Sequence, residues 1–334
     1  MNVLVTGATG FLGQCVVAKA VEANHRVVAM TGPHRDTASN MFGSSVAQVR
    51  ADLRHRGEWA TMLGATEVVI HAAAAAGGER ARQLASTVVG TENLLAALQD
   101  VALERFIHIS SFSVYDFHAL RPGAVLDETS RVEASPSERD AYTESKIAQE
   151  MLVREWCAQR GVPCVILRPG AIVGPGKSWG DGAELAAGPF SVVVAPRALF
   201  RMVSLSNCAE AIVKAIDAPV SGTVTLNIVD EELPTNAEYF RLCRRLGAPT
   251  GTMLPVPWMV LDLVGRTLQM VSRRWLDGRL RLPELLDHRR QEARWKPLRY
   301  PNDQARRVLG WRSEQDAAAT ARTTRASAGS AHHG

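Results

Sequence analysis

Residues 3–13 read Val3-Leu4-Val5-Thr6-Gly7-Ala8-Thr9-Gly10-Phe11-Leu12-Gly13, a short apolar run that ends in a glycine-rich turn. After the turn, Val16, Val17 and Ala20 recur at the spacing of one helix face. A second apolar run, from Arg26 to Met30, follows this predicted helix. The pattern therefore predicts a strand, a tight turn, a helix and a second strand parallel to the first.

The glycines of this turn predict a dinucleotide site. Gly7 and Gly10 allow a close approach of the backbone that a side chain would block, so a pyrophosphate can bind the amides at the helix N-terminus. The helix dipole favours negative charge at the same place. We therefore expect an α/β fold with a doubly wound, mainly parallel sheet of the Rossmann type and a smaller C-terminal substrate-binding region.

The composition is that of an ordinary globular protein. The 334 residues are 46% hydrophobic and 22% charged, which excludes a disordered, collagen-like or multi-span membrane chain. A net charge of +4 is too small to imply nucleic acid as a partner. The five cysteines have no metal-ligand spacing and no signal-like segment precedes the first strand, so we expect a cytoplasmic protein without a metal site.

The spacing T-G-x-x-G-x-x-G from Thr6 to Gly13 resembles that of the extended short-chain dehydrogenase/reductase superfamily, also called the NAD-dependent epimerase/dehydratase family. Ala51-Asp52-Leu53 is similar to the family's Asp-Leu pair, which addresses the adenine. His71-Ala72-Ala73-Ala74 is similar to its small-residue segment, over which the cofactor lies, and we interpret His71 as structural. In this part of the chain, the resemblance implies cofactor contacts for Gly7, Thr9, Gly10, Phe11, Leu12, Asp52, Leu53, Ala72, Ala73 and Ala74.

The end of the second strand bears on the choice between NAD and NADP. A carboxylate there would accept a hydrogen bond from the ribose 2′-hydroxyl of NAD and repel the 2′-phosphate of NADP. Thr31 or Gly32 holds this place, and Arg35 follows. We therefore favour NADP, with Arg35 near its phosphate, and keep NAD as the alternative.

Tyr142-Thr143-Glu144-Ser145-Lys146 contains the candidate acid/base. Tyr142 and Lys146 share a helix face, so we expect the ammonium to lower the pKa of the phenol. By the resemblance, Ser111 polarises the substrate oxygen, Tyr142 exchanges the proton, and Lys146 also binds the nicotinamide ribose. Pro169 and Gly170 are expected beside the nicotinamide carboxamide.

Four further residues are candidates for contact with a substrate. Ser113 and Tyr115 follow the catalytic Ser111, whereas Phe200 and Arg201 end a stretch rich in glycine and proline that is expected to cover the substrate. Packing in the protein interior is the alternative role for Tyr115, Phe200 and Arg201.

Departures from the family's patterns narrow the reaction. Phe112 and Ser113 stand where dehydratases of the family carry Asp-Glu, and Ala171 stands where many nucleotide-sugar epimerases carry Asn. The segments 142–150 and 167–176 look like the branch of 3β-hydroxysteroid dehydrogenases. We therefore expect an NAD(P)-dependent oxidoreductase that interconverts a secondary alcohol and a ketone on a steroid-like, secondary-metabolite or sugar-derived small molecule. A nucleotide-sugar epimerase with bound NAD, a non-catalytic dinucleotide sensor and a membrane-surface protein are the alternatives.

The C-terminal part of the chain carries the excess of positive charge. Residues 266–312 contain twelve Arg and one Lys against five acidic residues, so this segment has a net charge of +8. An acidic group on the substrate and an anionic membrane surface are its two candidate partners, and the apolar segment 257–271 beside it is a candidate membrane contact or homodimer face. By these patterns we divide the chain into a cofactor and catalytic core (1–176), a substrate region interleaved with it (177–312) and a disordered tail (313–334).

Overall fold

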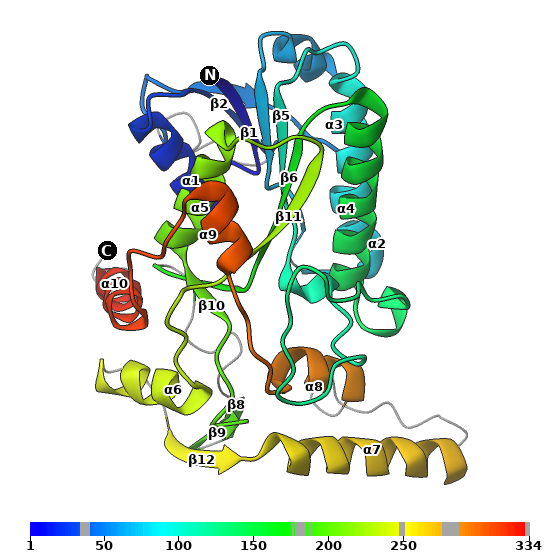
Figure 1. The fold of residues 1–334 in the computed structure, drawn as a ribbon, viewed down its shortest axis with the longest axis vertical. Coiled ribbons are helices and arrows are strands. Elements are labelled where there is room, and N and C mark those ends of the chain that lie inside the picture. Colours follow the sequence, from blue (N-terminus) through cyan, green and yellow to red (C-terminus); the bar gives the residue numbers. More distant parts are fainter. Residues whose placement is uncertain are drawn as a thin grey trace.

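A seven-stranded sheet forms the centre of the molecule in a computed structural model of the chain (Figure 1). Its strands, all parallel, lie in the order β11-β6-β5-β4-β1-β2-β3. They are β1 (Asn2–Thr6), β2 (Arg26–Thr31), β3 (Ala47–Arg50), β4 (Val68–His71), β5 (Arg105–Ile109), β6 (Cys164–Pro169) and β11 (Thr223–Ile228). The structure describes residues 1–33, 41–75, 77–175, 177, 185–187, 189–246, 251–275 and 287–330.

Helices cover both faces of this sheet. Because side chains alternate along a strand, Val3 and Val5 of β1 pack on one helical layer and Leu4 on the other, and all three are fully buried. One layer contains α1 (Phe11–Glu22), α5 (Leu205–Asp217) and α9 (Asp303–Leu309), and the other contains α2 (Arg80–Leu84), α3 (Gly90–Ala97) and α4 (Ala141–Arg160) (Figure 1). The predicted doubly wound parallel sheet is confirmed.

Short helical turns lie along the chain between these strands and helices. They are η2 (Glu58–Leu63), the π-helical turn η3 (Ala85–Val89), η4 (Phe112–Val114) and η5 (Pro136–Glu138). The π-helical turn places Thr87 so that its hydroxyl accepts a hydrogen bond from the backbone N–H of Ala75 at 3.0 Å, beside the carboxyl end of β4.

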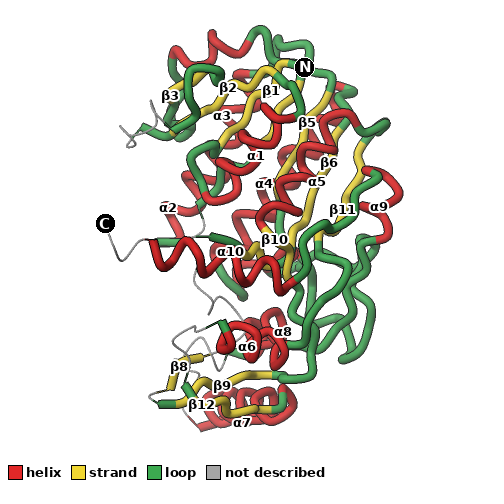
Figure 2. Tube along the Cα trace, turned by 90° about the vertical axis from the view of Figure 1, so that its left-hand side faces the viewer, coloured by secondary structure: helices red, strands yellow, loops and turns green. Residues whose placement is uncertain are grey.

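A smaller region lies beyond the carboxyl ends of the strands (Figures 1 and 2). It contains a three-stranded sheet, a two-stranded pair and three helices: β8 (Leu185–Ala187), β9 (Phe190–Val194), β12 (Thr252–Val256), β7 (Ala171–Val173), β10 (Met202–Ser204), α6 (Asn236–Arg245), α7 (Trp258–Trp275) and α8 (His288–Trp295). Since α5, β11 and α9 return to the main sheet, the chain after residue 176 contributes to both parts. Within the described residues, no helix has both the length and the apolar character that crossing a bilayer would require.

Residues 313–330 are ordered, where we expected a disordered tail over 313–334; residues 331–334 lie outside the described residues. Helix α10 (Ala317–Ser330) follows a loop that Asn207 holds, because the Asn207 Oδ1 accepts hydrogen bonds from the N–H groups of Glu314 and Gln315 at 3.2 and 3.1 Å. Ala321 and Thr324 on this helix are buried. The prediction was wrong because small Ala and Thr side chains give no apolar periodicity, yet they can pack closely against a distant part of the chain.

Candidate active site

The glycine-rich turn packs against the carboxyl end of β4. Gly7 has a φ of +68°, and a Cβ there would lie 2.8 Å from the backbone nitrogen of Ala73, so only glycine fits. Its carbonyl accepts a hydrogen bond from the Gly10 N–H at 2.9 Å, which closes the turn just before α1 begins at Phe11. The first N–H groups of α1 therefore point toward the space above the strand ends, as a phosphate site requires.

A buried polar network joins this turn to the catalytic helix. The His71 ring lies 2.7 Å from Thr6 Oγ1 through Nδ1 and 2.8 Å from Thr91 Oγ1 through Nε2. Gln149 of α4 donates hydrogen bonds to Thr91 Oγ1 and to the carbonyl of Ala73 at 2.9 and 3.0 Å. Burial lowers the pKa of His71 to about 3, so its ring is neutral near pH 7 and acts as a hydrogen-bonding member of this network.

Ser111 and Tyr142 come together above the ends of β5 and β6. Ser111 follows β5 directly, and Asp140 caps α4 by accepting a hydrogen bond from the Thr143 N–H at 2.7 Å, which places Tyr142 in the first turn. Ser111 and Tyr142 line the same two cavities. Burial raises the pKa of the Tyr142 phenol above its ordinary value; the Ser111 hydroxyl opposes this and the Asp140 carboxylate adds to it.

Lys146 has partners that the sequence did not predict. Its Nζ donates hydrogen bonds to the Ile109 carbonyl at 2.6 Å and to Gln149 Oε1 at 2.9 Å. Burial lowers its pKa to about 7, although the Glu150 carboxylate acts in the opposite direction. The expected lowering of the Tyr142 pKa by Lys146 is therefore not seen in this structure, because the ammonium is turned to the strand end and the phenol is buried.

Two adjoining cavities meet at Ser111 and Tyr142. The first, of about 300 Å³, extends toward the turn and is lined by Ala72, Ala74, Lys146, Phe200 and others. The second, of about 560 Å³, lies on the side of the smaller region and includes Ser113 and Arg201. Both are also lined by Pro169, Gly170 and Ala171. A Cβ on Gly170 would lie 2.4 Å from the Arg201 carbonyl, so this glycine permits the close packing that forms the shared wall.

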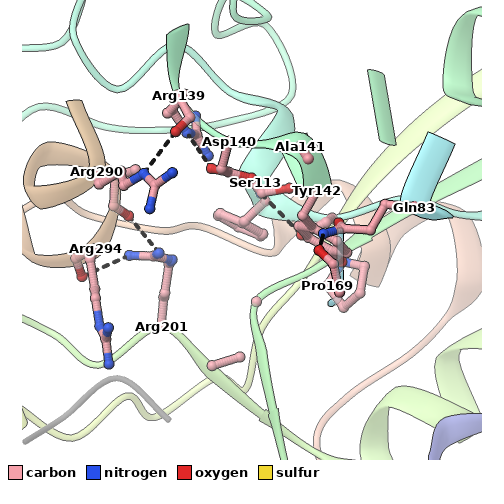
Figure 3. Close-up of a pocket in the computed structure, with 16 residues that line it drawn as sticks. Gln83, Ser113, Arg139, Asp140, Ala141, Tyr142, Pro169, Arg201, Arg290 and Arg294 are labelled. Carbon is pink, nitrogen blue, oxygen red and sulfur yellow. Dashed lines mark hydrogen bonds and ion pairs between the residues drawn. The ribbon is translucent and has the colours of Figure 1, made fainter. Parts of the chain in front are cut away.

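Four arginines line the larger cavity opposite Tyr142 and Pro169. Figure 3 shows Arg139, Arg201, Arg290 and Arg294 gathered on one side of the cavity. Arg201 donates to the Ala293 carbonyl at 2.6 Å, and Arg290 donates to the Arg139 carbonyl at 2.8 Å, so backbone contacts hold them in place. Among the described lining residues, Asp140 is the one carboxylate, at 3.6 Å from Arg139. The wall therefore carries a local excess of positive charge.

Arg139, Arg290 and Arg294 were not among the predicted site residues. The positive charge of residues 266–312 was the one sequence signal for Arg290 and Arg294, and Arg139 had none. Ser113, Phe200 and Arg201, by contrast, do line the cavities, and their contact with a substrate stays a prediction. The Ser113 hydroxyl is buried without a hydrogen-bond partner in the part of the chain that the structure describes.

Tyr115 lies in the protein interior and not in either cavity, so its predicted substrate contact is corrected. It is fully buried, its hydroxyl donates to Asn227 Oδ1 at 2.6 Å, and the Arg168 guanidinium lies over its ring. Arg168 in turn binds the buried Glu150 carboxylate, which also accepts a hydrogen bond from Ser110 at 2.6 Å. This buried ion pair thus links α4 to β6 and to the end of β5.

The remaining predicted cofactor residues lie along the same edge of the sheet. Asp52 follows β3 and binds Arg54 at 2.6 Å; these hydrogen bonds lower the pKa of its carboxyl to about 2. The carbonyl of Leu53 accepts a hydrogen bond from Asn93 at 2.8 Å. Arg35, on which the preference for NADP depends, lies outside the described residues.

The model of the NAD dependent epimerase/dehydratase family matches residues 3–188. This range contains the turn, the strand ends, Ser111, Tyr142 and Lys146. The chain belongs to this family. The match contains most of the residues that line the smaller cavity. Phe200 and Tyr239 of that lining lie beyond it, as does α8 with Arg290 and Arg294.

Relatives in the family come from the steroid branch as well as from the sugar epimerases. The chain is 30% identical over 178 residues to sterol demethylase protein B of Methylococcus capsulatus, covering 52% of each chain. It is 26% identical over 192 residues to a 3-beta-hydroxysteroid dehydrogenase of Mycolicibacterium neoaurum, covering 55% of this chain and 49% of the relative. The matches thus span about half the length of these curated relatives. The fold is similar to that of the UDP-glucuronic acid 4-epimerase of Bacillus cereus in complex with NAD, with a TM-score of 0.73, 18% identity and coverage of 99% and 100%.

Proposed function

We propose that this protein is an NAD(P)-dependent oxidoreductase that interconverts a secondary alcohol and a ketone on a small molecule with an anionic group. The observation that carries the proposal is the position of Ser111 and Tyr142, which both lie where the smaller cavity meets the cavity lined by arginines. In this proposal the smaller cavity takes the cofactor, the larger cavity takes the substrate, and Tyr142 acts as the acid/base between them.

The residues on the cofactor side fit a dinucleotide. Gly7 lets the turn pack directly on the backbone of Ala73, because a Cβ there would lie 2.8 Å from the Ala73 nitrogen. The small side chains of Ala72 and Ala74 line the smaller cavity, and Lys146 lines it as well. Family membership and the NAD in the related structure support a nicotinamide dinucleotide as the cofactor. NADP stays the favoured form because Thr31 ends β2 where NAD binding calls for a carboxylate.

In the oxidation direction, the Tyr142 phenolate accepts the hydroxyl proton of the substrate, and Ser111 donates a hydrogen bond to the same oxygen. The carbon–hydrogen bond would break as the carbonyl forms, and a nicotinamide held in the smaller cavity, beside Lys146 and Pro169, would supply the hydride acceptor. In reduction, Tyr142 returns the proton to the carbonyl oxygen. A cofactor ribose hydroxyl in the smaller cavity would bring a further hydrogen-bond partner to Lys146, whose own contacts fix it beside Ile109.

The arginine wall supports the anionic group. Arg201 and Arg290 lie on the same side of the larger cavity, across from Tyr142 (Figure 3). Planar guanidinium groups bind carboxylates and phosphates by paired hydrogen bonds. The buried hydroxyl of Ser113 offers a neutral contact between them and the reacting carbon. The proposed substrate class therefore includes steroid-like acids, secondary metabolites and sugar derivatives that carry an anionic group.

The test is turnover of NADPH and NADH with a panel of anionic and neutral ketones. We expect the wild-type protein to oxidise the cofactor with at least one anionic ketone, and Tyr142→Phe to lose about 10³-fold in kcat while it still binds the cofactor. Arg201→Met should raise KM for the anionic ketone and leave KM for its neutral ester unchanged. Arg26, exposed at the start of β2, provides the matched control Arg26→Met. A Tyr142→Phe variant with full turnover would contradict the proposal.

Epimerisation with bound NAD is the second candidate, because the same arginine wall suits the diphosphate of a nucleotide sugar. It predicts conversion of a nucleotide sugar with no net change in cofactor absorbance, and no release of reduced cofactor. A dinucleotide sensor without catalysis predicts tight cofactor binding and no turnover. The predicted homodimer and membrane contact remain predictions.

A further inference from the structure

The outward face of α7 is apolar and exposed. At 100° per residue, its exposed apolar residues fall within one arc of about 140°. Their side chains are 38% to 75% exposed, and this apolar face consists of Met259, Val260, Leu263, Val264, Met270 and Val271. Leu254 of β12, just before the helix, and Phe190 of β9, which pairs with β12, are also about half exposed. In Figures 1 and 2, β12 and α7 lie together at the end of the molecule farthest from β1.

The opposite side of α7 packs on the rest of the protein, so the helix is held in place with its apolar face outward. Trp258 is buried, and Asp262 lies 3.0 Å from the His288 Nδ1 of α8. Arg266 binds Asp262 at 2.9 Å and lies 4.0 Å from the buried Glu292. Asp262, the acidic residue of α7, is therefore paired on the inner side of the helix.

Positive charge accompanies the apolar face. Arg274 is exposed, and its position falls within the same arc as Leu263 and Met270. Helix α7 itself contains three Arg and one acidic residue, Asp262, a net charge of +2 over its 18 residues. An amphipathic helix with apolar side chains outward and several arginines along it matches the chemistry of an anionic phospholipid surface.

We propose that α7 attaches the protein to an anionic membrane surface, with its axis along the surface and its apolar face among the lipid chains. Asp262, Arg266 and Arg274 along the helix exclude a spanning orientation. At a membrane, Arg274 can extend to the lipid phosphates while its stem stays among the chains. A second copy of the chain is the poorer occupant, because the apolar face has no carboxylate to pair with a buried Arg274.

The experiment is co-sedimentation of the full chain with vesicles of phosphatidylcholine alone or with 30% phosphatidylglycerol. We expect wild-type protein to sediment only with the anionic vesicles, and Leu263→Glu/Met270→Glu to bind about a hundred-fold more weakly. Arg274→Gln should lower the partition coefficient about five-fold. Met62→Glu replaces an apolar side chain with 61% exposure, close to the 65% of Leu263 and the 64% of Met270, and should bind like the wild type.

Cofactor binding and circular dichroism establish that each variant is folded, so sedimentation does not depend on the proposed reaction. Wild-type protein that stays in the supernatant overturns the proposal, as does sedimentation that needs no phosphatidylglycerol or survives the double substitution. Light scattering that shows a wild-type dimer and a monomeric double variant assigns the face to a second copy instead. Loss of ketone turnover with vesicle binding intact bears on the proposed function alone.

Discussion

The contact between Asn207 and Asp230 lends itself to a quantitative test, through the substitution Asn207→Asp. Asn207 on α5 and Asp230 after β11 are 1% and 3% exposed, and the Asn207 Nδ2 donates to Asp230 Oδ1 at 2.8 Å. The same amide group donates to the carbonyl of Gln315 at 2.9 Å. The substitution replaces this shared donor by a second carboxyl group at hydrogen-bond distance from the first.

The loss of stability follows from the protonation of the two carboxyl groups, Asp230 and the one introduced at position 207. Burial has already raised the pKa of Asp230 to about 7, so two carboxylates cannot both be ionised there. Keeping a carboxyl of ordinary pKa near 4 protonated at pH 7 costs about 4 kcal/mol, and at pH 5 about 1.5 kcal/mol. We expect Asn207→Asp to lower the free energy of unfolding by about 4 kcal/mol at pH 7 and by much less at pH 5. A raised folded-state pKa means stability that is present at low pH and lost as pH rises toward 7.

Urea unfolding of wild type and variant at pH 5, 6 and 7 measures this difference. The double variant Asn207→Asp/Asp230→Asn restores one amide opposite one carboxylate and should recover most of the lost stability. A variant as stable as wild type at pH 7, or a deficit that grows as the pH falls to 5, would refute the reasoning.

Three further predictions concern the site and its support. Burial holds the pKa of Lys146 at about 7, so above pH 7 the folded state binds fewer protons than the unfolded chain. Between pH 7 and 9.5, the free energy of unfolding of the wild type should therefore rise by about 3 kcal/mol relative to that of Lys146→Met, measured by urea unfolding. Equal pH slopes for the two proteins would contradict this. Gly7→Ala should cost about 2 kcal/mol or more and abolish NADPH binding by fluorescence titration, because φ is +68° and Ala73 is close, whereas Gly64→Ala meets nothing within 4 Å and should bind normally. Tyr115→Phe loses the hydrogen bond to Asn227 and should cost about 1–2 kcal/mol of stability without changing kcat; a selective rise in KM would return Tyr115 to the substrate site.

Most of the cofactor side was predictable from the sequence. Clear apolar runs predict the strands that precede the turn after β1, the Ala72–Ala74 segment and Ser111. The carboxyl ends of parallel strands meet at one edge of the sheet, so these segments come together there. Tyr142 and Lys146 are placed by helix periodicity alone. The partners of Lys146 were not predictable, since Gln149 competes with Tyr142 on the same helix and only the packing chooses between them.

The substrate side needed long-range contacts. Arg139 precedes α4, Arg201 precedes β10, and Arg290 and Arg294 belong to α8, so no local pattern relates them. Tyr115 is four residues from Ser111, yet its partner Asn227 is 112 residues away and draws it into the core. Helix α10 likewise depends on Asn207, more than 100 residues before it.

Local and periodic signals were thus enough to predict the parallel sheet, the glycine turn after β1 and the shared helix face of Tyr142 and Lys146, because a turn needs its glycines and a helix repeats its faces within a few residues. The chemistry of the substrate cavity, the core position of Tyr115 and the docking of α10 depend on side chains that meet only when distant segments pack. Burial then sets the protonation of Lys146, His71 and Asp230, since desolvation by the folded chain, and not residue type, moves their pKa values.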